Sequence, residues 1–345
     1  MNDVFLLRFI VGMTSEGGGA IAFPVMTLAL GIAPSVARDF SFMIQSCGMS
    51  AAAFTINFMK IKLEHNSLLF CSLGGVAGLV FGLHMIDPNL TPPQKKMFFV
   101  SIWFSFAFTL YLLNRDHKRR TFMQIPNMNA WKALVLLFIG FVGGCFSSFA
   151  GSGIDICSFS FLCLLFRVSE KVATPTSVIL MAINTCVGFF WRGLVMQEIS
   201  QDAWEYLFVC IPIVVIGAPV GSLLGSHFHR LVLAFLVYAI DLVALIGGFA
   251  IVDQTPLLAG ISVAIIVVFL VFFMLLTKAG ELLMKRQLKK KGEPVVEERP
   301  PSYTSEERTS DDVTDIEVGI SKERSNGDSR NERVNDAFEN DISKL

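Results

Sequence analysis

Long apolar segments alternate with short polar links over the first 277 residues, and charged residues become dense from Lys278 onward. A helix needs roughly 20 apolar residues to cross a bilayer. Segments of about that length predict membrane-spanning helices at residues 35–59, 68–86, 97–113, 172–190, 206–224, 231–252 and 257–277. Because only helices and closed barrels satisfy every backbone polar group in lipid, we predict an all-α polytopic membrane protein.

Two glycine-rich clusters interrupt this pattern. The first begins at Gly12 and ends in the run Glu16, Gly17, Gly18 and Gly19. The second consists of Gly151, Ser152 and Gly153, inside an apolar run from 131 to 166. As one helix, that run would be about 54 Å long, whereas the hydrocarbon core is roughly 30 Å thick. Since glycine costs a helix about 1 kcal/mol relative to alanine, we predict a broken, re-entrant helix at each cluster.

The two clusters open two halves of similar sequence. The pair Val-Ala at 36–37 returns at 172–173, and the pattern Gly-x-x-x-Gly-x-His at 78–84 returns at 221–227. A single small-xxx-small pair usually reflects plain helix packing. Its return in the same order, with the histidine at the same offset, predicts a duplication.

Charge predicts how the two halves are oriented. If each broken segment enters and leaves on one side, each half has about three crossings and the repeats are inverted. The basic loop that begins at Arg115 and the Lys278–Lys291 run then share the cytoplasmic side, in accord with the positive-inside rule. The opposite side receives only Arg38, Lys95, Lys96 and Arg192.

This topology predicts four parts of the chain. We expect a first membrane repeat over 1–114 and a basic cytoplasmic loop over 115–130. A second repeat with one additional C-terminal transmembrane helix follows over 131–277, and a cytoplasmic, disordered tail over 278–345. The membrane is expected to be the plasma membrane or an endomembrane.

Composition agrees with a membrane protein and offers no catalytic chemistry. The chain of 345 residues is 53% hydrophobic, with a mean hydropathy of +0.59 and a net charge of −1. Its seven cysteines lie in apolar segments without metal-ligand spacing, which favours small buried hydrophobes. With no catalytic triad, zinc motif, phosphate loop or dinucleotide fingerprint, we predict no enzyme activity, cofactor, metal or nucleic-acid partner.

The tail carries two short motifs. Pro300–Tyr303 fits the PPxY pattern that WW domains bind. Ser343–Leu345 fits both a C-terminal PDZ ligand and a peroxisomal matrix address, and a coincidence is an equal alternative.

The glycine clusters also predict an anion site. The half-helices that begin at Ala20 and Ile154 have N–H groups without intrahelical partners, which carry about half a positive charge and bind anions. Secondary transporters build sites from such ends near the membrane midplane. Glu16 and Asp155 adjoin this unwound backbone, and because carboxylates repel an anion we interpret them as candidate proton-coupling groups.

Other polar side chains within the apolar segments are functional candidates as well, since polar groups at membrane depth are costly. Asn184 lies within a predicted span. Arg38 and Asp39 open another, where an interfacial ion pair is the alternative. Asp241 could equally cap a kink or pair with His227.

The residues of both clusters resemble a known family. The run from Gly12 through Gly19 to Pro24, followed by Pro-Ser-Val-Ala at 34–37, is similar to the first half of the TauE/SafE family of sulfite-exporter-like anion permeases. Residues 143–153 and Val-Ala-Thr-Pro-Thr-Ser at 172–177 are similar to its second half. The resemblance implies transport of sulfite, organosulfonates or related small anions by a eukaryotic-type member with a tail. It adds Ser41, Thr176 and Ser177 to the candidate substrate site.

Two functions follow from these patterns. The first is a secondary transporter of a small anion, most simply a sulfur oxyanion, organosulfonate or carboxylate, bound between two half-helix N-termini. The second is a membrane scaffold that recruits WW- or PDZ-domain proteins through its tail.

Overall fold

The computed structural model describes residues 23–291, except 116–121, 127, 228–229 and 253–254. The chain divides into two compact units, 1–293 and 294–345, and every described residue belongs to the first. The described residues are mainly helical and contain no strand, only an isolated bridge between Phe122 and Val168. This confirms the all-α prediction. The first glycine cluster and both tail motifs lie outside the described residues, so the expectations about them stay predictions.

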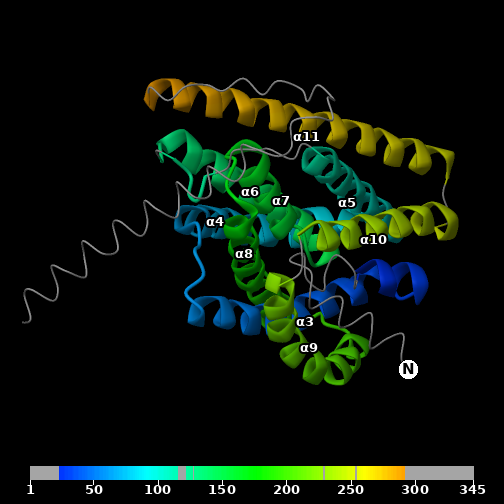
Figure 1. Ribbon diagram of the computed structural model, residues 1–345. Helices are drawn as coiled ribbons and strands as arrows, with labels where there is room; N and C mark the ends of the chain where they lie inside the picture. Colours follow the sequence, from blue (N-terminus) through cyan, green and yellow to red (C-terminus); the bar gives the residue numbers. More distant parts are fainter. Residues whose placement is uncertain (1–22, 116–121, 127, 228–229, 253–254, 292–345) are drawn as a thin grey trace, which may run out of the picture. The chain divides into compact units, whose positions relative to one another are not determined.

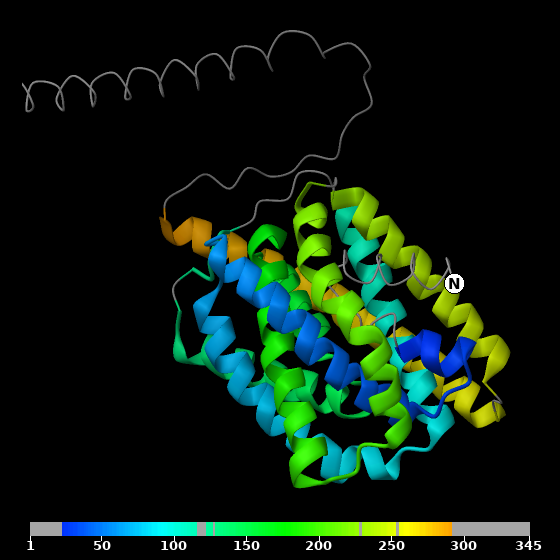
Figure 2. The same cartoon turned by 90° about the horizontal axis from the view of Figure 1, so that it is seen from below.

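Figure 1 labels the main helices, and Figure 2 shows the same elements from below. In chain order the elements are η1 (Val25–Ala29), α3 (Pro34–Phe58), α4 (His65–Phe81), η2 (Gly82–Ile86), η3 (Asp87–Asn89), α5 (Pro92–Arg115), α6 (Ala130–Ala150), α7 (Ile154–Ser160), η4 (Phe161–Leu165), α8 (Glu170–Phe190), η5 (Trp191–Val195), α9 (Gln201–His227), α10 (Arg230–Ile251) and α11 (Pro256–Lys291).

Within the described part, four helical stretches are long and apolar enough to cross a membrane: His65–Asn89, Ala130–Ala150, Glu170–Val195 and Pro256–Arg286. Large apolar side chains also cover the outside of the helices. Phe54, Phe58 and Phe138 are 74%, 78% and 64% exposed. Such a surface is unfavourable in water and suits lipid, so the protein is an integral membrane protein.

Helices α4 and α6 pack with their backbones in close contact, because glycines line the interface. A methyl group at Gly78 would lie 1.9 Å from Phe141 O, and one at Gly144 would lie 2.2 Å from Gly75 O. Small residues allow this approach where lipid offers no hydrophobic drive for helix association. The small-xxx-small pattern beginning at Gly78 therefore serves helix packing here.

The long apolar run breaks at the second glycine cluster, as predicted. Helix α6 ends at Ala150 and α7 begins at Ile154. Between them, Gly151 has a φ of +79°, a left-handed conformation that glycine adopts without steric cost. The following helix, Ile154–Leu165, is about 18 Å long, which is shorter than the roughly 30 Å hydrocarbon core.

Backbone hydrogen bonds at the end of η1 recur at the end of η4. Leu30 N donates to Val25 O at 3.0 Å, and Phe166 N donates to Phe161 O at the same distance. Donor and acceptor are both displaced by 136 positions (166 − 30 and 161 − 25). Helices α3 and α8 then begin at positions with the same displacement. The recurrence supports the predicted duplication, whereas the inverted orientation of the halves stays a prediction.

The same displacement relates two residues with positive φ. Gly31 has a φ of +67° and Arg167 a φ of +55°. For a residue with a Cβ, this region costs roughly 1 kcal/mol or more. The second half thus holds an arginine in a backbone conformation for which the first half uses glycine.

Helix α11 continues to Lys291, although the predicted tail begins at residue 278. The helix is supported there by packing on η4. A methyl group at Gly280 would lie 2.0 Å from Leu164 O, so the two backbones touch beyond the predicted end of the span.

We expect Gly78→Ala to destabilise the protein by about 1–3 kcal/mol, since its Cβ would collide with the Phe141 carbonyl. Thermal unfolding in detergent measures this. Gly260→Ala in α11 is the control, because no atom lies within 4 Å of its added methyl group. Equal melting temperatures for the two variants would contradict the proposed packing.

Candidate functional site at the break between α6 and α7

Three buried side chains near the break have polar atoms without a partner among the described residues. They are Ser41 through its Oγ, and Gln45 and Asn184 through both atoms of their amides. Each residue is at most 1% exposed. A buried polar group without a hydrogen bond costs about 1–3 kcal/mol. A cluster of such groups therefore indicates either a ligand or a chain segment outside the described residues.

Ser41 and Gln45 approach the break from α3. A methyl group at Gly151 would lie 2.6 Å from Ser41 Cβ and 3.4 Å from its Oγ. Gln45 lies one helical turn further along α3, on the same face. Another turn on, Met49 belongs to the apolar cluster that contains Ile154, the first residue of α7. The face of α3 that carries both polar groups thus lies against the break and the start of α7.

Asn184 approaches from α8. Met181, nearly one turn before it, belongs to the same cluster as Ile154. A methyl group at Gly75 would lie 2.3 Å from Ile154 Cδ1 and 3.3 Å from Asn184 Oδ1. The amide of Asn184 therefore lies close to the start of α7, and the absence of a side chain at Gly75 makes room for both groups.

Asp155 lies in the first turn of α7 and is 2% exposed. Ser152 Oγ lies 3.3 Å and 3.4 Å from its two carboxylate oxygens, and donates to them. The described residues place no lysine, arginine or histidine nitrogen within 4.0 Å of this carboxylate. Asp155 is thus a buried acid without a counter-cation, beside a helix start.

The backbone at the break is held by close packing. Gly151 N donates to Ser147 O at 2.7 Å, and Ile154 N donates to Ser147 Oγ at 3.2 Å. A methyl group at Gly153 would lie 2.9 Å from Ser147 N. The predicted residues Gly151, Ser152, Gly153 and Asp155 therefore form one fixed turn.

The hydroxyls of Thr176 and Ser177 already have backbone partners. Thr176 Oγ1 donates to Val172 O at 2.6 Å and accepts from Glu64 N at 3.1 Å. Ser177 Oγ donates to Thr174 O at 2.8 Å. Their contact with substrate stays a prediction, as does that of Glu16, Gly17, Gly18 and Gly19, which lie outside the described residues.

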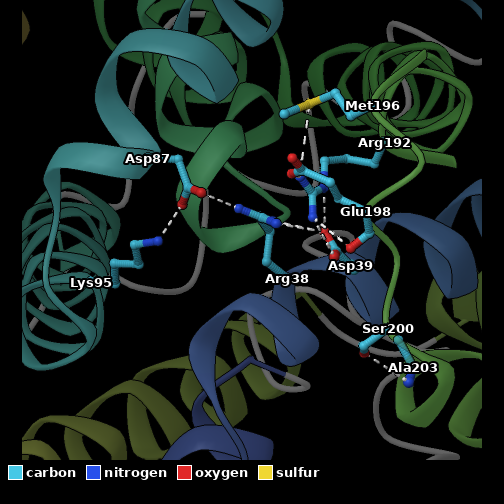
Figure 3. A network of polar contacts seen from close by, with 9 residues as sticks. All are labelled: Arg38, Asp39, Asp87, Lys95, Arg192, Met196, Glu198, Ser200 and Ala203. Atoms are coloured by element: carbon cyan, nitrogen blue, oxygen red, sulfur yellow. Dashed lines mark hydrogen bonds and ion pairs between the residues drawn. The ribbon is translucent and has the colours of Figure 1, made fainter.

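A second polar cluster, the ion-pair network, lies beside the site at the start of α3 (Figure 3). Arg192 of η5 binds both carboxylate oxygens of Asp39 at 3.0 Å. Arg38 Nε donates to Asp39 Oδ1 at 2.9 Å, and its Nη1 pairs with Asp87. Two further pairs complete the network, Lys95 with Asp87 and Arg192 with Glu198.

The network is balanced, with three cations and three carboxylates. Charge is therefore compensated within it, and we interpret it as a structural tie between α3, η3, α5 and η5. The expected Arg38–Asp39 ion pair is confirmed. Three basic residues assigned by sequence to the same side of the membrane, Arg38, Lys95 and Arg192, meet in this network.

Sequence reasoning missed Gln45, although a signal was present: an amide in the middle of an apolar segment, four residues after Ser41. It also missed that Asp87 and Arg192 belong to one network. These residues lie on links 105 positions apart (192 − 87), so no local pattern connects them. Asp241 is buried on α10 with Oδ2 unpartnered within the described part, and its expected pairing with the His227 side chain is untested.

Membrane-crossing helices, a broken helix and an adjoining buried polar site are the features of a membrane permease. A family model described as "Sulfite exporter TauE/SafE" matches residues 4–247, which is more than half of the chain. The protein belongs to the sulfite exporter TauE/SafE family, as the doubled motif predicted. Comparisons with curated proteins and with solved structures found no match. The family consists of transporters, so the protein is an anion permease of the sulfite-exporter type and not an enzyme.

We expect Asp39→Asn to destabilise the protein by about 3–5 kcal/mol, because two buried guanidinium groups lose their shared carboxylate. Glu198→Gln is the control. Its side chain is 59% exposed, so we expect a loss below about 1 kcal/mol. Thermal unfolding in detergent measures both, and a smaller loss for Asp39→Asn than for Glu198→Gln would refute a structural role.

Proposed function

We propose that the protein is a secondary transporter whose small anionic substrate binds at the break between α6 and α7. The substrate class is a sulfur oxyanion, an organosulfonate or a carboxylate. The observation that carries this proposal is the convergence of Ser41, Gln45 and Asn184 on the break, with polar atoms that lack partners in the described part. Their hydroxyl and amide groups are hydrogen-bond donors, which an oxyanion requires.

The helix that begins at Ile154 favours anion binding electrostatically. Its N-terminal N–H groups carry partial positive charge and favour anions. Glycine at 151 and 153 lets α3 and α6 pack directly against this turn, which fixes the start of the helix beside Ser41. We propose Ser152, Thr176 and Ser177 as further contacts at the rim of this site.

The second helix N-terminus of the proposed site would come from the first glycine cluster. Gly17, Gly18 and Gly19 precede η1 as Gly151–Gly153 precede α7 and η4. At the displacement of 136 residues that relates the two turns, Gly153 corresponds to Gly17 (153 − 136) and Ser152 to Glu16 (152 − 136), so the two clusters overlap. In an inverted arrangement, the two N-termini would face one substrate near the membrane midplane.

Asp155 is proposed to bind the coupling proton, and Glu16 is proposed as the acidic residue of the first cluster, at the position that corresponds to Ser152 (152 − 136). A buried carboxylate without a cation would repel an anionic substrate while it is charged. Protonation removes that repulsion, so substrate and proton would bind together. The alternative function as a scaffold is favoured by no observation on the described residues.

We expect Gln45→Met and Asn184→Leu to lower anion flux by roughly 10- to 100-fold, the effect of one hydrogen bond to a charged group. Because these amides lack protein partners in the described part, apolar side chains of similar size should leave the melting temperature equal or higher. Proteoliposomes with labelled sulfite, sulfoacetate and a small carboxylate provide the measurement.

The control for both variants is Ser50→Ala, at an exposed position of α3, which should keep wild-type flux. Unchanged flux of every tested anion in both variants, with wild-type flux present, would place the site elsewhere. Absence of flux of any small oxyanion in the folded wild-type protein would refute the proposed function itself.

We expect Asp155→Asn to remove the dependence of flux on an imposed pH gradient, since an amide cannot exchange a proton. Exchange of labelled for unlabelled anion at equal pH should persist. Both are measured in the same proteoliposomes, and a flux that still follows the pH gradient would contradict the assignment of Asp155.

A further inference from the structure

A small cleft lies where η4 ends, and none of the residues that line it belongs to the proposed transport site. It is formed by the end of η4, the link at 122–126, the first turn of α6 and the end of α11. Lys132 and Arg167 line it together with the backbone of Gly280. The cleft has room for about one water-sized group.

Positive charge is in excess at this cleft. Lys132 is 3% exposed, and its Nζ donates to the neutral carbonyl of Pro126. No carboxylate among the described residues lies within 4.0 Å of that Nζ. Arg167 has one carboxylate partner, Glu281, at 2.9 Å from its Nη2. The two cations that line the cleft therefore have one direct carboxylate partner, which is itself 49% exposed. The nearby buried carboxylate of Glu64 accepts from Ile125 N in the link at 122–126.

Arg167 also keeps one donor unused. The residue is 4% exposed, and its Nε is buried with no hydrogen-bond partner among the described residues. Leaving a charged donor unpaired in this way is costly. At the equivalent position of the first half, Gly31 provides the same left-handed backbone without a side chain. The backbone alone therefore does not explain the arginine.

The sequence around the cleft is basic, and aromatic residues border it. Trp131 is exposed and its ring lies 5.9 Å from Lys132 Nζ, an arrangement typical of the membrane interface. Basic residues of the preceding loop and of the end of α11 belong to the same predicted cytoplasmic side: Arg115, Lys118, Arg119, Arg120, Lys285 and Arg286. Basic pockets between helices on that side bind phosphorylated headgroups.

We propose that this cleft binds a phosphate group, with one phosphate oxygen entering it to accept hydrogen bonds from Arg167 Nε and Lys132 Nζ. The oxygen would supply the missing acceptor, and its charge would compensate the excess cation. The phosphate can belong to an anionic lipid headgroup or to a soluble phosphate, and the test separates these sources. The proposal does not rest on the transport function.

The test uses the full-length protein in dodecyl maltoside, a detergent that contains no phosphate. One arm adds phosphatidylserine or a phosphorylated phosphatidylinositol to the micelles, and the other adds inorganic phosphate to the buffer. The readouts are the melting temperature and the lipid retained in native mass spectrometry. For the wild type we expect the anionic lipid to raise the melting temperature by ~3 °C or more.

Arg167→Gly is the informative variant, because glycine keeps the backbone conformation that Gly31 shows in the first half. We expect its melting temperature in the detergent alone to be unchanged or higher, and the shift with anionic lipid to disappear. Lys132→Met should reduce the shift as well. Lys171→Gln, at an exposed position outside the cleft, removes the same charge and should keep the full shift.

A shift that depends on Arg167 and appears with lipid identifies a headgroup, and one that appears with inorganic phosphate identifies a soluble source. Either result supports a phosphate site. The proposal is overturned if neither addition shifts the melting temperature of the wild type, or if Arg167→Gly keeps the wild-type shift. It is also overturned if Lys171→Gln loses as much of that shift as Arg167→Gly.

Discussion

The position of the candidate site depends on the close packing of α4, α6 and α7 around Ile154. A methyl group at Gly143 of α6 would lie 2.8 Å from Ile154 Cα, and one at Gly75 of α4 would lie 2.3 Å from Ile154 Cδ1. Gly144 brings α6 onto the carbonyl of Gly75 in the same layer. The backbones of α4 and α6 thus touch, α6 touches the backbone of α7, and the Ile154 side chain fills the space beside Gly75, which fixes the start of α7 in the fold. Ser41, Gln45 and Asn184 are brought to it from α3 and α8.

The two polar clusters beside this contact differ in how their charges are compensated. In the ion-pair network, each guanidinium of Arg38 and Arg192 has carboxylate partners inside the protein. At the break, Ser41, Gln45 and Asn184 are neutral groups without described partners, and Asp155 is a carboxylate without a cation within the described part. A fixed cation in a low-dielectric site would hold an anion strongly, whereas neutral donors bind it less strongly. A permease has to release its substrate, so neutral donors suit transport and paired charges suit structural support.

The repeated backbone carries different chemistry in its two halves. The start of α3 carries the ion pair of Arg38 and Asp39, and the equivalent positions of α8 are Thr174 and Pro175. Conversely, the left-handed residue before α3 is a glycine, and the one before α8 is Arg167. The hydrogen-bonded turns are common to both halves. The two halves therefore share these backbone turns and differ in the side chains that surround them.

The sequence by itself determined the all-α class, the membrane environment, the family and the break at Gly151–Gly153. These follow from segment length, composition and glycine placement, which are local properties of the chain. Only the tertiary structure decided which polar groups lack partners, because partnership depends on contacts between distant segments. Thr176 and Asn184 look alike as polar residues in one apolar segment, yet Glu64 and Val172 engage the hydroxyl of Thr176. The amide of Asn184 is left at the start of α7 without a described partner.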